Sequence, residues 1–148
     1  MMGMGRARRR GEAGFTLFEL LVVLAIMALL AAIVAPRVVG YLGRAKSDVA
    51  QSQMSNLVTS LELYYLDVGR YPSQEQGLDA LLTAPEEDGE PVPGWRGPYL
   101  RDEAGLTDPW GRAYTYAYDA ETDRIQVFSY GRDGEPGGEG EDGDLIAR

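Results

Sequence analysis

The chain opens with a long apolar segment. Residues 20–35 contain no charged or polar side chain, and counted from Phe15 the segment is 21 residues long. At about 1.5 Å per residue, a helix of that length crosses the ~30 Å apolar core of a bilayer. Beyond Pro36, apolar residues recur every three or four positions, which is typical of a helix with one buried face. We therefore predict one helix from Phe15 to about Leu66, apolar on all sides at first and amphipathic afterwards.

The rest of the chain predicts short elements. Ser73 and Gln76 have the spacing of a capping box, which indicates a short helix ending near Leu82. Residues 84–98 carry four prolines and several acids and predict a loop. Residues 108–111 predict a type I turn. Residues 113–118 and 125–130 predict two strands, which residues 119–124 join as a hairpin. The predicted fold is α+β, with a long N-terminal helix packed on a small antiparallel sheet.

Composition and charge exclude several kinds of functional site and partner. The chain has 148 residues and no cysteine or histidine, which excludes disulfides, thiolate zinc sites and mechanisms that need an imidazole base. Its net charge of −9 argues against a nucleic-acid partner. Four arginines precede the apolar segment within residues 1–14, and three basic residues follow it within residues 37–46. The positive-inside rule thus favours a cytoplasmic N-terminus only modestly.

A single carboxylate lies near the start of the apolar segment. Glu19 would be costly in lipid unless it were paired or reached the headgroups. A secretory signal peptide is one alternative, but the apolar run is longer than a usual signal core and no small-x-small cleavage site closes it cleanly. A plain transmembrane anchor is another alternative, and it leaves Glu19 unexplained.

The sequence Gly-Phe-Thr-Leu-Phe-Glu at residues 14–19, behind a basic leader, resembles the processing motif of type IV pilins and pseudopilins. The resemblance implies that a prepilin peptidase cuts between Gly14 and Phe15 and methylates the new amine of Phe15. Within a filament, the buried carboxylate of Glu19 needs a partner, which the amine of a neighbouring Phe15 supplies. Such a pair sets the register between subunits.

Four later blocks resemble the major pseudopilins of type II secretion systems. They lie at residues 64–82, 95–100 (Trp-Arg-Gly-Pro-Tyr-Leu), 108–111 (Asp-Pro-Trp-Gly) and 128–134 (Phe-Ser-Tyr-Gly-x-Asp-Gly). The resemblance implies a type IV pilin-like fold and a structural subunit that is not an enzyme. Such subunits polymerise into a periplasmic pseudopilus that drives the export of folded proteins. The implied partners are further copies of the chain, minor pseudopilins, the prepilin peptidase, the inner-membrane assembly platform and the secretion ATPase.

The resemblance also implies a domain plan. Residues 1–14 would be a leader that is removed, residues 15–36 a transmembrane and filament-core helix, and residues 37–148 a periplasmic domain on a single-pass inner-membrane protein. Two alternatives stay open. One is a type IV pilin or minor pseudopilin subunit, and the remote one is a membrane-anchored periplasmic enzyme that uses a carboxylate pair such as Asp119 and Asp123.

The C-terminal tail is the candidate metal site. Residues 131–144 hold six carboxylates against one arginine, with six glycines among them. Because like charges repel and glycines add chain entropy, we expect this segment not to order unaided. Calcium prefers carboxylate and carbonyl oxygens, and the resemblance implies calcium here. By position the expected ligands are the side chains of Asp133, Asp142 and Asp144, with an oxygen of Ser129; a disordered acidic tail is the alternative.

Overall fold

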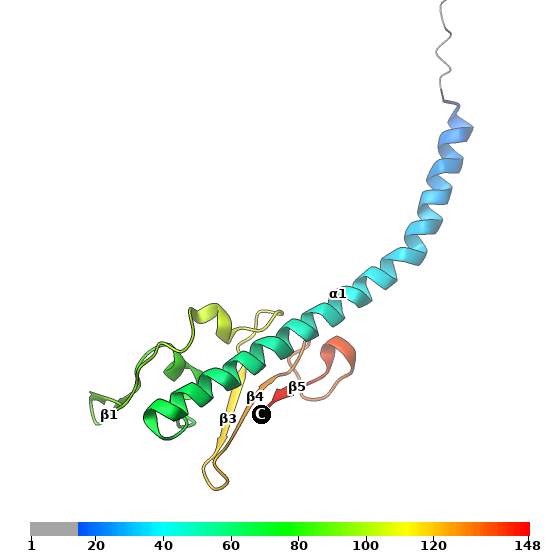
Figure 1. Ribbon diagram of the computed structural model, residues 1–148. Helices are drawn as coiled ribbons and strands as arrows, with labels where there is room; N and C mark the ends of the chain where they lie inside the picture. The colour runs from blue at the N-terminus through cyan, green and yellow to red at the C-terminus, as the bar shows by residue number, and fades with distance from the viewer. Residues whose placement is uncertain (1–14) are drawn as a thin grey trace, which may run out of the picture. The chain divides into compact units, whose positions relative to one another are not determined.

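The computed structural model describes residues 15–148 (Figure 1). The chain divides into two compact units, residues 1–39 and 40–148, and helix α1 (Leu17–Val68) contributes to both. The prediction of one helix from Phe15 to about Leu66 is confirmed, since both ends of α1 lie within two residues of the expected positions. The predicted leader, residues 1–14, lies outside the described residues.

In the first unit, α1 presents apolar side chains on every side. All residues from 15 to 39 are exposed. Within residues 15–148, α1 is the one helix long and apolar enough to cross a membrane. A helix that is apolar all round requires lipid or other helices to cover it.

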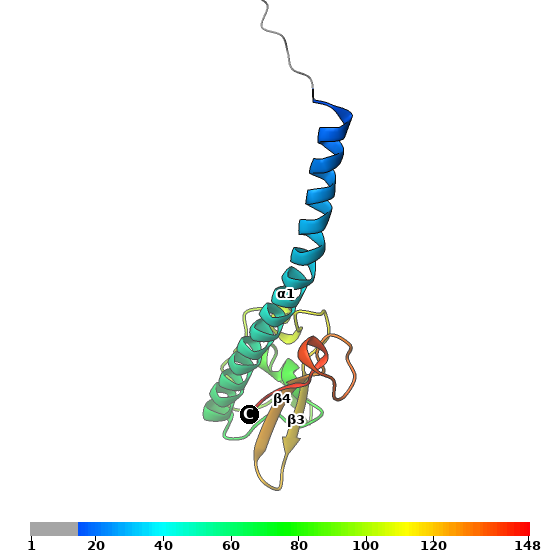
Figure 2. The ribbon, with the colours of Figure 1, turned by 90° about the vertical axis from the view of Figure 1, so that its right-hand side faces the viewer.

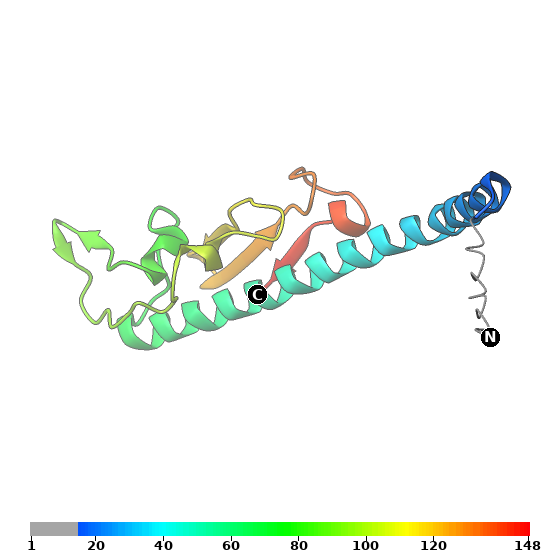
Figure 3. The ribbon, with the colours of Figure 1, turned by 90° about the horizontal axis from the view of Figure 1, so that it is seen from above.

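In the second unit, α1 forms one wall of the core. Its buried apolar side chains recur at intervals of three or four residues, and they are Ala50, Met54, Leu57, Leu61 and Tyr64. Except for Ala50, these side chains pack in one core cluster with buried residues of the sheet, of the segment just before β3 and of the short 3₁₀ helix η1 (Gly77–Leu81). These residues include Tyr116, Val127, Tyr114 and Leu81. Figure 3 shows these elements together on one side of α1.

The core sheet has three antiparallel strands in the order β3 (Thr115–Asp119), β4 (Arg124–Ser129) and β5 (Leu145–Ala147) (Figure 2). Tyr116 pairs with Val127, and Val127 pairs with Ala147, so that three buried side chains lie in one row. The predicted hairpin is confirmed as β3–β4. The sequence did not predict β5, which returns the C-terminal tail to the sheet and makes residues 130–144 a closed loop.

The remaining elements are short. The capping box forms, since Ser73 N–H donates to Gln76 Oε1 at 2.9 Å and Gln76 N–H donates to Ser73 Oγ at 3.2 Å. The expected loop at residues 84–98 contains a two-stranded hairpin that the sequence analysis missed. Its strands are β1 (Glu86–Glu87) and β2 (Glu90–Pro91). Elsewhere in the second unit lie two further 3₁₀ helices, η2 (Glu103–Leu106) and η3 (Gly140–Asp142).

Candidate functional site

The start of α1 carries the predicted processing and assembly residues. Gly14 lies outside the described residues, and Phe15 is 82% exposed. Thr16 caps the helix, because its Oγ1 accepts a hydrogen bond from the backbone N–H of Glu19 at 3.2 Å. Glu19 therefore lies in the first turn, where the positive end of the helix dipole favours a carboxylate. None of the three ion pairs found among residues 15–148 involves Glu19.

The C-terminal loop is the second candidate site, and the turn at residues 108–112 supports it. The predicted turn forms, with Gly111 N–H donating to Asp108 O at 3.0 Å. The buried carboxylate of Asp108 accepts the N–H groups of Trp110 and Arg112 on Oδ1, at 3.0 and 2.9 Å. Its Oδ2 accepts the hydroxyl of buried Ser129 at 2.7 Å. The end of β4 is thereby joined to the turn.

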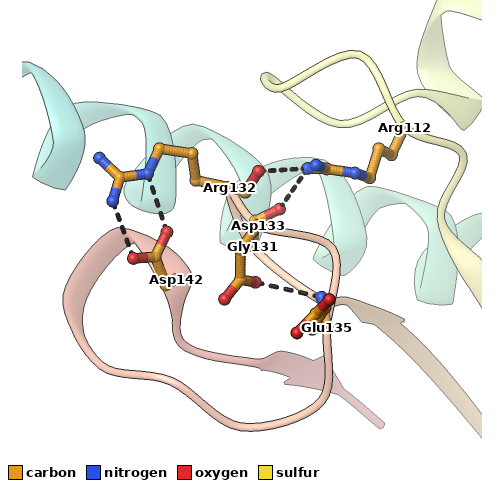
Figure 4. Close-up of polar contacts among 6 residues, drawn as sticks. All are labelled: Arg112, Gly131, Arg132, Asp133, Glu135 and Asp142. Carbon is orange, nitrogen blue, oxygen red and sulfur yellow. Dashed lines mark hydrogen bonds and ion pairs between the residues drawn. The ribbon is translucent and has the colours of Figure 1, made fainter.

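Two arginines bind the loop itself (Figure 4). Arg112 Nη1 donates to the carbonyl oxygens of Gly131 and Arg132, at 2.9 and 2.6 Å. Arg132 Nε and Nη2 donate to the two carboxylate oxygens of Asp142, each at 2.8 Å. This bidentate pair raises the pKa of the Arg132 guanidinium, and the hydrogen bonds to Asp142 are the main cause.

The predicted calcium ligands lie around one loop but make separate contacts. Asp133 Oδ1 accepts the N–H of Glu135 at 3.1 Å, and Asp144 Oδ2 accepts the N–H of Gly137 at 3.0 Å. Asp142 is paired with Arg132, and Ser129 with Asp108, as described above. Within residues 15–148, no group of three or more acidic side chains lies close enough together to hold a metal ion. Metal ligation by the four residues stays a prediction.

Sequence reasoning missed several residues that shape these sites. Thr16 could have been found, since Thr-x-x-Glu before an apolar run is a capping-box pattern. Arg112 carried no local signal, because its partners lie 19 and 20 residues further along the chain. The sequence around Glu141 likewise did not indicate that its side chain lies against Gly43 of α1. A Cβ atom on Gly43 would overlap the carboxylate of Glu141.

Two family models match the sequence. Residues 37–148 match the family described as "Type II secretion system (T2SS), protein G", and residues 9–35 match the prokaryotic N-terminal methylation motif. Together the two matches cover the apolar helix and the whole of the second unit.

Individual relatives agree with the family models. The chain is 36% identical over 138 residues to the type II secretion system core protein G of Pseudomonas aeruginosa, covering 93% of this chain and 96% of the relative. It is 37% identical over 138 residues to the protein of the same name from Vibrio cholerae, covering 93% and 92%. Among solved structures, it is similar to the major pseudopilin from the type 2 secretion system of enterohaemorrhagic Escherichia coli. That match has a TM-score of 0.58 and 34% identity, and covers 73% of this chain and 90% of that one.

Proposed function

The chain belongs to the type II secretion system protein G family, and on this basis we propose that it polymerises into a periplasmic pseudopilus that drives export of folded proteins. The family expected from the sequence is confirmed, and it is a family of structural pseudopilin subunits, not of enzymes. The relatives carry the name core protein G and the solved structure that of a major pseudopilin, which favours this role over a type IV pilin or a minor pseudopilin.

The exposed apolar part of α1 carries the proposal. Over residues 15–39 the helix has no covering protein surface within residues 15–148. The bilayer covers such a helix in the membrane-anchored subunit, and helices of neighbouring subunits cover it in a filament. Glu19 is the exception on this surface, since a carboxylate buried between helices requires a cationic partner. The methylated amine of Phe15 from a neighbouring subunit is our proposed partner.

Processing supplies that amine. The match to the methylation motif supports cleavage between Gly14 and Phe15 by a prepilin peptidase, followed by methylation of Phe15. Before cleavage the nitrogen of Phe15 is part of a peptide bond and carries no charge, so the pair with Glu19 forms only in the mature subunit. We propose the inner membrane as the site of the anchor, with the assembly platform, the secretion ATPase and the minor pseudopilins as partners.

Mass spectrometry of the protein extracted from membranes tests the processing step. The expected N-terminus is N-methylated Phe15, and Gly14→Leu should retain the leader. An intact leader on the wild-type chain, in cells that contain the peptidase, would contradict the proposal.

Secretion and filament cross-linking test the role of Glu19. Glu19→Val should insert in the membrane but lower filament formation and export, because the neighbouring amine loses its counter-charge. Leu20→Val is the matched control, since it changes an adjacent exposed apolar residue and leaves the charge in place. Normal export by Glu19→Val would rule out the ion pair.

We further propose calcium as a ligand of the C-terminal loop. The loop offers carboxylates and carbonyls without nitrogen or sulfur ligands, which fits calcium. Asp133 and Asp144 are exposed, and among the described residues each uses one carboxylate oxygen in a hydrogen bond. These two are the better suited of the predicted ligands. Asp142 and Ser129 would first have to release Arg132 and Asp108.

Thermal unfolding of the full chain in detergent micelles, with calcium or with EGTA, tests this site. Bound calcium should raise the Tm by mass action, and Asp133→Asn or Asp144→Asn should abolish the rise. Glu135→Gln is the matched control, because it removes a charge of the same loop that is not among the predicted ligands. A Tm indifferent to calcium, with no metal found by elemental analysis, would contradict the proposal.

A further inference from the structure

We propose that the side chain of Gln74 closes the outer edge of the core sheet, and that this edge is a latent pairing site for a second copy of the chain. Strand β3 lies at one edge, because the order of the sheet is β3-β4-β5. The free backbone groups of an edge strand are able to pair with another chain. The inference concerns the sheet and rests neither on the proposed filament contacts nor on the proposed calcium site.

Gln74 takes the place of a neighbouring strand. Its Nε2 donates to the carbonyl oxygen of Tyr116 at 2.8 Å, and its Oε1 accepts the backbone N–H of Tyr118 at 3.0 Å. A side-chain amide offers a donor and an acceptor as a peptide group does. The carbonyl of Tyr116 and the N–H of Tyr118 therefore point away from β4, and one amide satisfies both.

The backbone around Gln74 is held on both sides. Before it, the hydroxyl of Tyr116 donates to the carbonyl oxygen of buried Pro72 at 2.9 Å. Around it, the capping box joins Ser73 and Gln76 by two hydrogen bonds. Gln74 itself is exposed, so its amide covers the edge at the surface of the protein.

The preceding part of the same edge is covered by backbone. Tyr114 N–H donates to the carbonyl oxygen of Leu106 at 2.9 Å, beside an antiparallel bridge between Thr107 and Ala113. The bonds made by Gln74 differ from this one, because they depend on a single exposed side chain. That side chain can rotate away while the backbone stays folded, and its rotation opens the edge.

The two groups that Gln74 covers are complementary to themselves. In an antiparallel pair of β3 strands related by a two-fold axis at Ala117, residue 116 of each copy lies opposite residue 118 of the other. Each Tyr118 N–H then meets a Tyr116 carbonyl, and the same contact forms twice. Thr115 lies opposite Asp119, so like charges do not face one another across the pair. A second copy of the chain is therefore the occupant that fits the open edge.

Disulfide cross-linking of the full chain in detergent micelles tests the proposal. The chain has no cysteine, so Ala117→Cys introduces its only thiol. Residues directly opposite in an antiparallel pair have Cα atoms about 4.5–5.5 Å apart, which a disulfide can bridge. Micelles cover the apolar part of α1, so association through that part of the helix is suppressed.

With Gln74 in place, we expect Ala117→Cys to stay monomeric under mild oxidation. Adding Gln74→Ala removes both hydrogen bonds and should raise the yield of cross-linked dimer by about tenfold or more. Gln126→Ala is the matched control, because it removes the same type of side chain from the neighbouring strand and leaves both bonds of Gln74 in place. Ser52→Cys, on an exposed part of α1, measures cross-linking away from the edge.

Two results would overturn the inference. One is an equal yield of dimer from Ala117→Cys with and without Gln74→Ala. The other is an equally large rise for Ser52→Cys, since association would then not occur at β3. The amide hydrogen exchange of Leu57 and Leu61 shows whether each variant keeps its core. If Gln74→Ala loses it, Gln74→Met supplies the same test with the same rise expected, and an unchanged yield overturns the inference.

Discussion

The beginning of the C-terminal loop passes very close to the returning segment at Gly131, and a methyl group there should be costly. Gly131 has φ +65°, and an added Cβ would lie 2.5 Å from the carbonyl oxygen of Glu141 and 2.9 Å from that of Gly143. Gly140 is a matched control in the same loop. Its φ is +66°, and a Cβ would meet nothing within 4 Å. Comparing Gly131→Ala with Gly140→Ala therefore separates backbone strain from close packing.

The structure sets the expected difference in the free energy of unfolding. Left-handed backbone costs an L-residue roughly 1–2 kcal/mol, and this applies to both variants. In Gly131→Ala the returning backbone must also move, which breaks the bond from Arg132 N–H to Glu141 O and strains those from Arg112. One ordinary and one charged hydrogen bond contribute about 2–4 kcal/mol. We expect a loss of about 3–6 kcal/mol for Gly131→Ala, against about 1–2 kcal/mol for Gly140→Ala.

Tryptophan fluorescence on heating measures this difference in the full chain. Both tryptophans, Trp95 and Trp110, lie in the second unit and report on its unfolding. At roughly 4 °C for each kcal/mol, Gly131→Ala should melt about 8–16 °C below Gly140→Ala. Equal melting temperatures for the two variants would show that the chain segments are not packed as closely as the structure has them.

Three other changes test the core and the turn. Leu61→Ala should lower the free energy of unfolding by about 2–5 kcal/mol, because Leu61 is fully buried, whereas Leu66→Ala on the exposed face of the same helix should change it little in thermal unfolding. Burial raises the pKa of Tyr114 and Tyr116 in the folded state, so the free energy of unfolding should be constant up to about pH 10 and fall above it. Melting curves across pH 8–11 measure this fall, and Tyr116→Phe should make it less steep. Asp108→Asn should cost about 1–3 kcal/mol in the same melting assay, because the amide nitrogen that replaces Oδ2 cannot accept the hydrogen bond from the Ser129 hydroxyl; an unchanged Tm would contradict the described bond.

The elements that the sequence predicted are those set by local patterns. The length of α1 follows from apolar spacing, and the bonds between Ser73 and Gln76 follow from a four-residue motif. The hairpin β1–β2 also had a local signal, since Asp88 and Gly89 are a two-residue turn pair with φ of +54° and +82°. The prolines on either side of that pair favoured a loop instead.

Other features had no local signal. Strand β5 is three residues long, too short to show alternation, and its pairing with β4 follows only from the path of the loop. The bonds of Arg112 to the loop depend on tertiary structure in the same way, because the turn and the loop meet only once the sheet is formed. Local patterns therefore predicted where the candidate metal loop begins, at the end of β4, but neither its return in β5 nor the side chains that position it.

The charge of the C-terminal loop can be balanced in two ways. From the sequence, six carboxylates appeared to require a metal ion, because only one arginine lies among them. The structure gives three of these carboxylates other partners: a guanidinium binds Asp142, and backbone N–H groups bind Asp133 and Asp144. Such N–H groups carry partial positive charge and become available where the chain turns sharply. In an acidic, glycine-rich loop the glycines can therefore contribute N–H donors as well as flexibility, as Gly137 does for Asp144.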